Sequence, residues 1–360
     1  MSAAPATDDV VADWDEAKHN KRVPLLVLEP LREFLDDHAL GEGPLCVEPI
    51  GAGRSNVIFR VERDGADLVL RRPPRPPLPP SAHDVLREAR ILAGLEGTDV
   101  RIPPLRAACD DETVIGAPFY VMDRVDGEVI LDDVPAALDD PVGLAGVSRE
   151  LVDALAELHA VDWAATSLRE MARGTGYLER QLRRFSGLWE HNRARDVADV
   201  DAVAGWLAHN RPESPPDTVV HGDYRVGNVL YARAAPARLT AILDWEMATI
   251  GDPLADVGYL CATWIEVGDP DRGMYEVNGI TRRPGFLSRA ELVARYEERS
   301  GRSVDDVRWY EVLALWKSAI FMEGNYRRAV SGLSDDPYLR QFGDGVLELA
   351  RRARELTESM

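Results

Sequence analysis

The 360-residue sequence predicts an α+β protein in which a small strand-rich region precedes a larger, mostly helical one. Alternating apolar and polar residues, as in Phe59 to Glu62, indicate strands within the first 125 residues. Apolar residues at helical spacing dominate from residue 147 onward, apart from short strands between 218 and 244. We therefore expect a tail with a leading helix, a strand-rich part and a helical part, over 1–43, 44–125 and 126–360.

Several elements are expected in the strand-rich part. A helix over 27–40 precedes it, with Gly41 as its C-cap. Asp64-Gly65 is expected to turn one strand into the next, and the proline-rich segment 73–80 fits only an extended loop. A second helix is expected over 84–95. The strands are expected at 45–50, 57–62, 67–72, 105–109 and 119–125.

The second part begins with a strong amphipathic helix. Val147–His159 carries Leu151, Leu155 and Leu158 on one face. Further helices are expected near 176–191, 197–209, 253–266, 289–300, 305–330 and 336–356. Short strands are expected at 218–220, 228–231 and 239–243.

Composition and charge exclude several functions. The 42 lysines and arginines are outnumbered by 62 aspartates and glutamates, so the formal net charge is −20. This charge repels phosphate backbones and anionic lipid, and we expect neither nucleic-acid nor membrane-surface binding. Three cysteines without a CxxC pair indicate reduced thiols, not a disulfide framework or a zinc site. An acidic N-terminus argues against a signal peptide, and no apolar run reaches the roughly 18–20 residues of a membrane span. These features predict a cytoplasmic protein.

The most informative stretch runs from His221 to Tyr231. Asp223 follows His221 by two residues and Asn228 lies five further on, the spacing of a kinase catalytic loop. A carboxylate there accepts the proton of an attacking hydroxyl, and an amide oxygen ligates Mg²⁺ without adding charge. Alone, the pattern also fits a polar turn in which Asp223 caps backbone amides.

A second acidic residue strengthens the kinase interpretation. Asp244 ends the apolar strand Ala241–Leu243, as does the Mg²⁺-binding aspartate of kinases. By itself Asp244 also fits a turn at a strand end. Two carboxylates and an amide converging on one site, however, would need a divalent cation to offset their repulsion. We predict that Asn228 and Asp244 are the metal ligands and that Asp223 is the catalytic base.

With these motifs, the chain resembles the aminoglycoside phosphotransferase and choline kinase-like family from about residue 44 to 350. Its similarity is strongest to the kinase-like domains associated with acyl-CoA dehydrogenases. The resemblance implies a two-lobed protein-kinase-like fold, with a small antiparallel-sheet N-lobe that binds nucleotide and a larger, mostly helical C-lobe. The stretches that carry it are Val69–Pro74, Ser81–His83, His221–Asn228, Gly251–Asp256, Ala262–Trp264 and Phe321–Tyr326.

A glycine-containing segment lies between the first two strands of the sheet. Gly51, Gly53, Ser55 and Asn56 are implied to bind nucleotide, because glycines let the backbone approach phosphates closely. A dinucleotide fingerprint is excluded, since a strand follows instead of a helix. Without the resemblance, this segment fits an ordinary hairpin turn as well.

Protein kinases carry a phosphate-binding lysine at the end of the third strand, paired with a helix glutamate. None of the three lysines falls there, so Arg71 or its neighbour Arg72 has to supply the charge. Glu88 is the expected partner, although it also fits a solvated helix carboxylate. Backbone groups near Asp123 and Val125, in a hinge-like segment, are implied to bind the adenine ring.

Arg225 is predicted to neutralise charge on the transferred phosphoryl group. The alternative is an ion pair with Asp252 or Asp256. Candidate substrate residues are acids and an aromatic that suit a bulky or cationic compound, although each also fits a core or surface role: Glu246, Trp264 and Glu323.

The sequence therefore predicts a small-molecule kinase that uses ATP, or alternatively GTP, with Mg²⁺. The acceptor is a hydroxyl of an aminoglycoside-like antibiotic or a related compound. The alternative acceptor is a hydroxyacyl metabolite of the acyl-CoA type, which would link the protein to acyl-CoA metabolism. A nucleotide-binding pseudokinase is a third hypothesis, prompted by the absent lysine. A two-metal phosphoesterase would need further His or Asp ligands.

Overall fold

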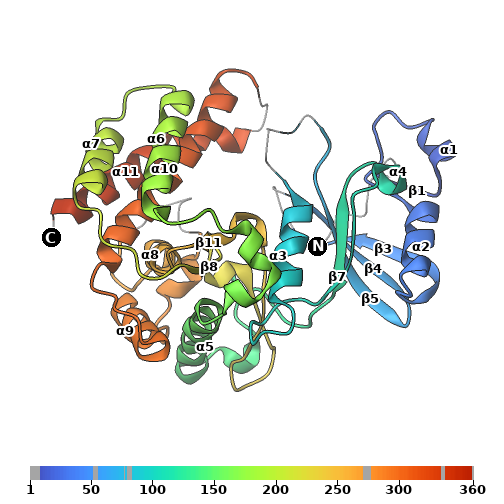
Figure 1. Cartoon of the computed structure of the whole chain (residues 1–360), viewed down its shortest axis with the longest axis horizontal. Coiled ribbons are helices and arrows are strands. Elements are labelled where there is room, and N and C mark those ends of the chain that lie inside the picture. Colours follow the sequence, from blue (N-terminus) through green and yellow to red (C-terminus); the bar gives the residue numbers. More distant parts are fainter. Residues whose placement is uncertain are drawn as a thin grey trace. The chain divides into compact units, whose positions relative to one another are not determined.

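The computed structural model describes residues 9–51, 56–76, 78, 83–270, 277–333 and 337–358. The chain forms two compact units (Figure 1). Unit 1 extends to Thr98 and also includes 102–126 and 166–168. Unit 2 contains 99–101, 127–165 and the chain from Arg169 onward. A sheet-based first unit and a mostly helical second unit confirm the predicted α+β class.

Unit 1 is built on a five-stranded antiparallel sheet with the order β3-β4-β5-β7-β6 (Figure 1). The hairpin between β4 and β5 turns at Asp64-Gly65 as predicted, and Gly65 has the positive φ of +78° that favours glycine there. The strands are β3 (Glu42–Pro49), β4 (Val57–Asp64), β5 (Ala66–Arg72), β6 (Leu105–Cys109) and β7 (Phe119–Asp123).

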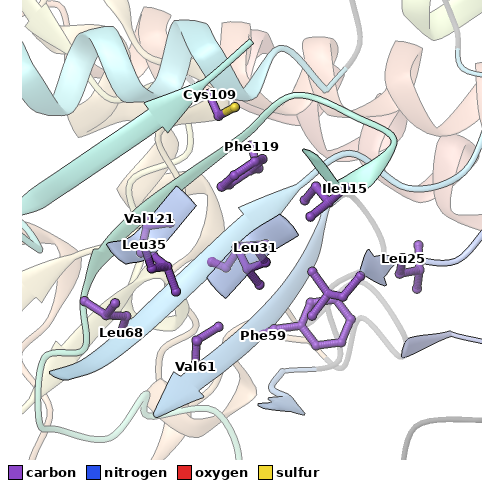
Figure 2. Packing of buried hydrophobic residues seen from close by; sticks show 12 residues of the cluster. Leu25, Leu31, Leu35, Phe59, Val61, Leu68, Cys109, Ile115, Phe119 and Val121 are labelled. Carbon is purple, nitrogen blue, oxygen red and sulfur yellow. The ribbon is translucent and has the colours of Figure 1, made fainter. Parts of the chain in front are cut away.

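The two faces of this sheet have different surroundings. Helix α2 (Leu28–Asp37) buries Leu31 and Leu35 in an apolar cluster with residues such as Leu68, as Figure 2 shows. Helix α3 (Val85–Leu95) contacts β6 and β7. Because side chains alternate along a strand, Arg71 on β5 points to the face opposite Leu68 and Leu70. An arginine on the α3 side can therefore meet polar groups of that helix.

Short elements surround this core. Strand β1 (Val10–Val11) pairs in parallel with β2 (Leu26–Val27), so the polar N-terminal stretch is joined to unit 1 from residue 9 onward. Helices α1 (Trp14–Ala17) and α4 (Glu112–Ile115) complete the unit.

Unit 2 is mostly helical and carries two small hairpins, β8 with β11 and β9 with β10. Its helices are α5 (Pro141–His159), α6 (Tyr177–Asn192), α7 (Ala198–His209), α8 (Leu254–Thr263), α9 (Arg289–Ser300), α10 (Val307–Val330) and α11 (Pro337–Glu358). Its strands are β8 (Thr218–Val220), β9 (Val229–Tyr231), β10 (Leu239–Ile242) and β11 (Thr249–Gly251). Short 3-10 turns cover Ala136–Leu138, Trp163–Ala165, Val226–Asn228, Trp245–Met247 and Gly279–Arg282, with Ser167–Met171 divided between the units.

The helix boundaries follow from local chemistry. Helix α5 begins at Pro141, six residues before the predicted start, and the Asp140 carboxylate accepts the N–H groups of Val142 and Gly143. The first turns contain Gly143 and Gly146, which interrupt the apolar pattern, so the sequence predicts a later start. Helix α10 packs against both α8 and α11. Among the described residues, no helix has the length and apolar character to cross a membrane.

Candidate active site

The backbone of the loop that follows β8 is hydrogen-bonded to one carboxylate. Asp256 on α8 accepts the backbone N–H of His221 at one oxygen and that of Gly222 at the other, both at 2.7 Å. Gly222 has φ of +85°, and an added Cβ would lie 2.7 Å from the Met247 carbonyl oxygen. A side chain does not fit there, so the loop needs glycine at this point.

The His221 imidazole connects this loop to β10. Its Nε2 donates to the Leu243 carbonyl at 2.8 Å, and its Nδ1 accepts the Asp223 N–H at 3.2 Å. Both ring nitrogens are occupied and the side chain is fully buried. His221 therefore orients the loop and has no free nitrogen with which to act as a base.

A second histidine supports Asp256 from the other side. His159 Nε2 lies 3.2 Å from an Asp256 oxygen, and its Nδ1 lies 2.7 Å from the Tyr296 hydroxyl. Burial lowers the pKa of His159 below its usual value, so the ring is neutral at pH 7 and donates to Asp256. The carboxylate that anchors the loop is thus held by three hydrogen bonds.

Asp223 is the residue of the loop that the sequence predicts as the catalytic base. Asn228 Nδ2 donates to one of its oxygens at 2.7 Å, and Arg225 Nε lies 3.6 Å from the other. The Tyr259 hydroxyl of α8 also hydrogen-bonds to it. About a quarter of the Asp223 side chain is exposed, at 24%, so a substrate hydroxyl can reach it. The position suits a general base.

The β9–β10 hairpin brings the predicted metal ligands together. Val229 pairs with Ile242, and the next residue along β10, Leu243, donates to the Asn228 carbonyl at 2.8 Å. Asp244 follows directly in the left-handed region, with φ of +65°. This register places Asn228 and Asp244 at the same end of the hairpin.

The Asn228 amide is turned so that its oxygen, and not its nitrogen, is available as a metal ligand. Its Nδ2 donates to both the backbone carbonyl and the carboxylate of Asp223, while Oδ1 accepts no hydrogen bond from a described residue. An amide oxygen and a carboxylate fit Mg²⁺, which prefers oxygen ligands. The described residues hold no cluster of three or more His, Cys, Asp or Glu side chains suited to a metal. Water or substrate phosphate oxygens would have to complete the shell.

In unit 1, the carboxylate of Glu88 on α3 contacts three polar side chains. Arg71 Nε lies 3.0 Å from one carboxylate oxygen, and the Tyr120 hydroxyl donates to the same oxygen at 3.3 Å. Asn56 Nδ2 donates to the other at 3.0 Å, while its own Oδ1 accepts from His83 at 3.2 Å. Glu88 is 1% exposed and therefore not a solvated helix carboxylate.

Arg72 has a different environment from Arg71. Its guanidinium donates to the carbonyl oxygens of Leu25 and Ile115, and its Nε donates to that of Pro73. Burial lowers its pKa to about 10. Arg72 therefore ties the N-terminal segment to the sheet, which leaves Arg71 as the candidate for phosphate binding.

The other predicted nucleotide residues are two residues of the glycine-containing segment, Gly51 and Gly53, with Ser55, and the hinge-like pair Asp123 and Val125. Gly51 is exposed with φ of +76°, whereas Gly53 and Ser55 lie outside the described residues. The Asp123 carboxylate pairs with Arg106, and its backbone N–H donates to the Pro104 carbonyl. The Asp123 N–H is therefore occupied, and the Val125 N–H is the remaining candidate to donate to a nucleotide's adenine ring.

The three candidate substrate residues have different surroundings. Trp264 is fully buried and its indole donates to the Leu287 carbonyl. Glu323 is fully buried, accepts the Ala194 N–H at 2.9 Å and pairs with Arg195. Glu246, in the turn just after Asp244, is only partly buried. These surroundings favour a structural role for Trp264 and Glu323 and leave Glu246 as the substrate candidate.

Arg225 does not pair with either of the acids proposed as its alternative partners. Asp252 accepts the Tyr310 hydroxyl at 2.6 Å, and Asp256 is engaged by the loop. Arg225 instead contacts Asp223 and Asn278.

Two site residues are not predicted from the sequence. Tyr259 lies three residues after Asp256 on α8, a spacing that places both on one helix face and could have been noticed. Asn278 lies in an irregular segment without any pattern.

Comparisons with known proteins identify a family whose model matches most of the chain. The model of the phosphotransferase enzyme family matches residues 47–303. Acyl-CoA dehydrogenase family member 11 of Gallus gallus is 31% identical over 327 residues, covering 88% of this chain and 41% of that protein. The chain thus spans less than half of this relative's length.

Solved structures share the fold. A protein from Ralstonia eutropha, assigned as an aminoglycoside phosphotransferase, has 27% identity and a TM-score of 0.77, covering 92% of this chain and 98% of its own. A ternary complex of an aminoglycoside phosphotransferase with AMP-PNP and hygromycin B has 18% identity and a TM-score of 0.56, covering 89% and 98%. These matches confirm the resemblance and the kinase-like fold expected from the sequence.

Proposed function

Because the chain belongs to the phosphotransferase enzyme family, we propose that it moves the γ-phosphate of ATP to a hydroxyl group of a small molecule. The observation that carries the proposal is the arrangement of Asp223, Asn228 and Asp244: an accessible carboxylate beside an amide oxygen and a second carboxylate at one end of a hairpin. GTP remains the alternative donor. A cytoplasmic location, predicted from composition, is part of the same proposal.

The residues of unit 2 divide the chemistry among them. Asp223 orients the acceptor hydroxyl and takes its proton, and Arg225 offsets charge on the transferred group. Asn228 and Asp244 would hold Mg²⁺, which supplies charge neutralisation on the phosphates when bound. The rate comes mainly from positioning and electrostatics.

Unit 1 would supply the nucleotide contacts. The Arg71 guanidinium, oriented by Glu88, has the charge and planar geometry to bind phosphate oxygens. Asn56 holds Glu88 and supports the pair indirectly. The Val125 N–H is the proposed adenine contact.

Two acceptor classes are compatible with this chemistry. The Ralstonia eutropha structure supports an aminoglycoside-like acceptor, whose amines would suit a chain with net charge −20. The relative named acyl-CoA dehydrogenase family member 11 supports a hydroxyacyl acceptor linked to acyl-CoA metabolism. A panel containing both classes separates them directly.

The decisive experiment measures ATP- and Mg²⁺-dependent phosphorylation of that panel by the purified chain. We expect Asp223→Asn to lower turnover at least a hundredfold, since a lost general base typically costs about 10²–10⁴-fold. Asp244→Ala removes a proposed Mg²⁺ ligand and should abolish turnover. Glu213→Gln, a change to an exposed acid of unit 2, serves as the matched control and should leave turnover unchanged.

Two outcomes would contradict the proposal. Near-normal turnover in Asp223→Asn would show that Asp223 is not the catalytic base. Tight Mg-ATP binding by the wild-type chain without phosphorylation of any acceptor would favour the pseudokinase hypothesis.

A further inference from the structure

The Arg225 guanidinium uses two of its three nitrogens within the protein. Nη1 donates to Asn278 Oδ1 at 3.4 Å, and Nε lies 3.6 Å from Asp223 Oδ1. Nη2 makes no hydrogen bond to a described residue. The side chain is about one-fifth exposed. Among the three nitrogens, Nη2 is the one that keeps its hydrogen-bonding capacity for a ligand with respect to the described residues.

Asn278 is placed to fix that orientation. It is 1% exposed, and its Nδ2 donates to the Thr263 carbonyl at the end of α8, 3.3 Å away. This bond decides which end of the amide faces Arg225, because Nδ2 cannot accept. Its backbone carbonyl accepts the N–H and the hydroxyl of Thr281 at 3.0 and 2.9 Å. The acceptor offered to Arg225 is therefore held on both sides.

Gly227 provides the space that the guanidinium occupies. An added Cβ would lie 2.3 Å from Arg225 Nη1 and 3.0 Å from a Leu131 methyl carbon. Gly227 does not have a positive φ, so backbone conformation does not explain the glycine. The absence of a side chain is what lets Arg225 reach Asn278.

We propose that Asn278 and Gly227 are positioning residues that direct the Arg225 Nη2 group toward the terminal phosphate of the nucleotide. This inference rests on the proposed function and adds two residues to its site. It distinguishes a positioning role from the simpler alternative, in which buried Asn278 only stabilises the segment that follows α8. The two roles differ in one measurable way. Only if Asn278 positions Arg225 does its loss weaken the binding of nucleotides that carry a terminal phosphate and leave the binding of other nucleotides unchanged.

The test needs no knowledge of the acceptor. Calorimetry on the full chain with Mg²⁺ compares AMP-PNP, which has a terminal phosphate, with ADP, which lacks it. We expect Asn278→Ala and Arg225→Ala each to weaken AMP-PNP binding about tenfold, as for a lost hydrogen bond to a charged group. ADP binding should change less than about twofold, the limit expected for contacts untouched by the substitution.

A double-mutant cycle isolates the coupling. In the Arg225→Ala background, Asn278→Ala should weaken AMP-PNP binding no further. Gly227→Ala leaves Asn278 intact and should reproduce the selective loss, which guards against an Asn278 variant that folds poorly. Asn210→Ala, an asparagine that donates to a backbone carbonyl at the end of α7, is the matched control.

Two results would overturn the inference while the proposed function stands: equal weakening of AMP-PNP and ADP, or full additivity in the cycle. A wild-type chain that binds neither nucleotide would overturn the proposed function itself, and the inference with it.

Discussion

Arg71 and Arg72 are neighbours on β5, yet strand alternation gives them opposite environments. Arg71 reaches Glu88 on the α3 side, whereas Arg72 bonds to three backbone carbonyls on the other side. The sequence left the choice open because Leu68, Val69 and Leu70 are all apolar, so no alternation identifies the faces. Only the position of α3 resolves it.

Tyr259 yields a prediction at this same scale. Burial and the charge of Asp223 raise the pKa of its hydroxyl well above 10, so it stays a hydrogen-bond donor across the working pH range. We expect Tyr259→Phe to lower kcat several-fold, because the Asp223 carboxylate loses one of the donors that orient it. The KM for ATP should stay nearly constant.

Steady-state kinetics with ATP varied at saturating acceptor check this expectation. A Tyr259→Phe enzyme with unchanged kcat would show that Asn228 and Arg225 suffice to orient the base.

At the level of elements, α8 organises the catalytic loop from one face. Asp256 holds the backbone at 221 and 222, Tyr259 contacts the side chain at 223, and the Thr263 carbonyl fixes Asn278, which holds Arg225. These three α8 residues are spaced by three and four, the spacing of one helix face. A single rigid helix thus sets several site residues at once.

Asp252, just before α8, gives a stability prediction. Burial raises its pKa to about 6 despite hydrogen bonds from Tyr310, Ser214 and Leu254. In the unfolded chain the carboxyl has its ordinary pKa of 3.8, so at pH values between 3.8 and about 6 the folded state binds more protons than the unfolded state. Its contribution to the unfolding free energy therefore falls as pH rises through this range. From pH 5 to pH 8 the loss is on the order of 1 kcal/mol.

Asp252→Asn removes this titration. Urea unfolding at pH 5 and pH 8 should show the variant gaining about 1 kcal/mol relative to wild type at the higher pH. A constant difference between the two proteins at both pH values would contradict the assignment.

Sequence patterns identified most elements but not all boundaries. Strand β4 followed from alternation, and the hairpin that leads into β5 followed from Asp64-Gly65. Strand β11 was missed, because three residues show no period and its formation depends on pairing with β8. The spacing of the loop residues predicted Asp223 and Asn228. Asn278 could not be predicted, because it reaches Arg225 only in the folded chain and no local sequence pattern marks it.

For the whole molecule, the proposed Mg-ATP site predicts how ligands act on stability. The two predicted metal ligands, Asn228 and Asp244, both lie in unit 2. We expect Mg-ATP at about a hundred times its dissociation constant to stabilise the chain by about 2.7 kcal/mol.

Thermal unfolding with and without EDTA measures this effect. Chelation should remove most of the stabilisation, because ATP without the metal leaves the oxygen ligands at 228 and 244 unused. An identical shift with and without EDTA would exclude a metal-dependent nucleotide site.

The hairpin that carries Asn228 and Asp244 also shows where the protein can be engineered. Its tip, residues 232–238, is mostly exposed, whereas the paired residues of β9 and β10 are mostly buried. A peptide tag or fluorophore-binding sequence grafted into the tip lengthens the connection without moving either strand end. One residue inserted within β9 or β10 would instead flip every later side chain of that strand and separate the two predicted ligands.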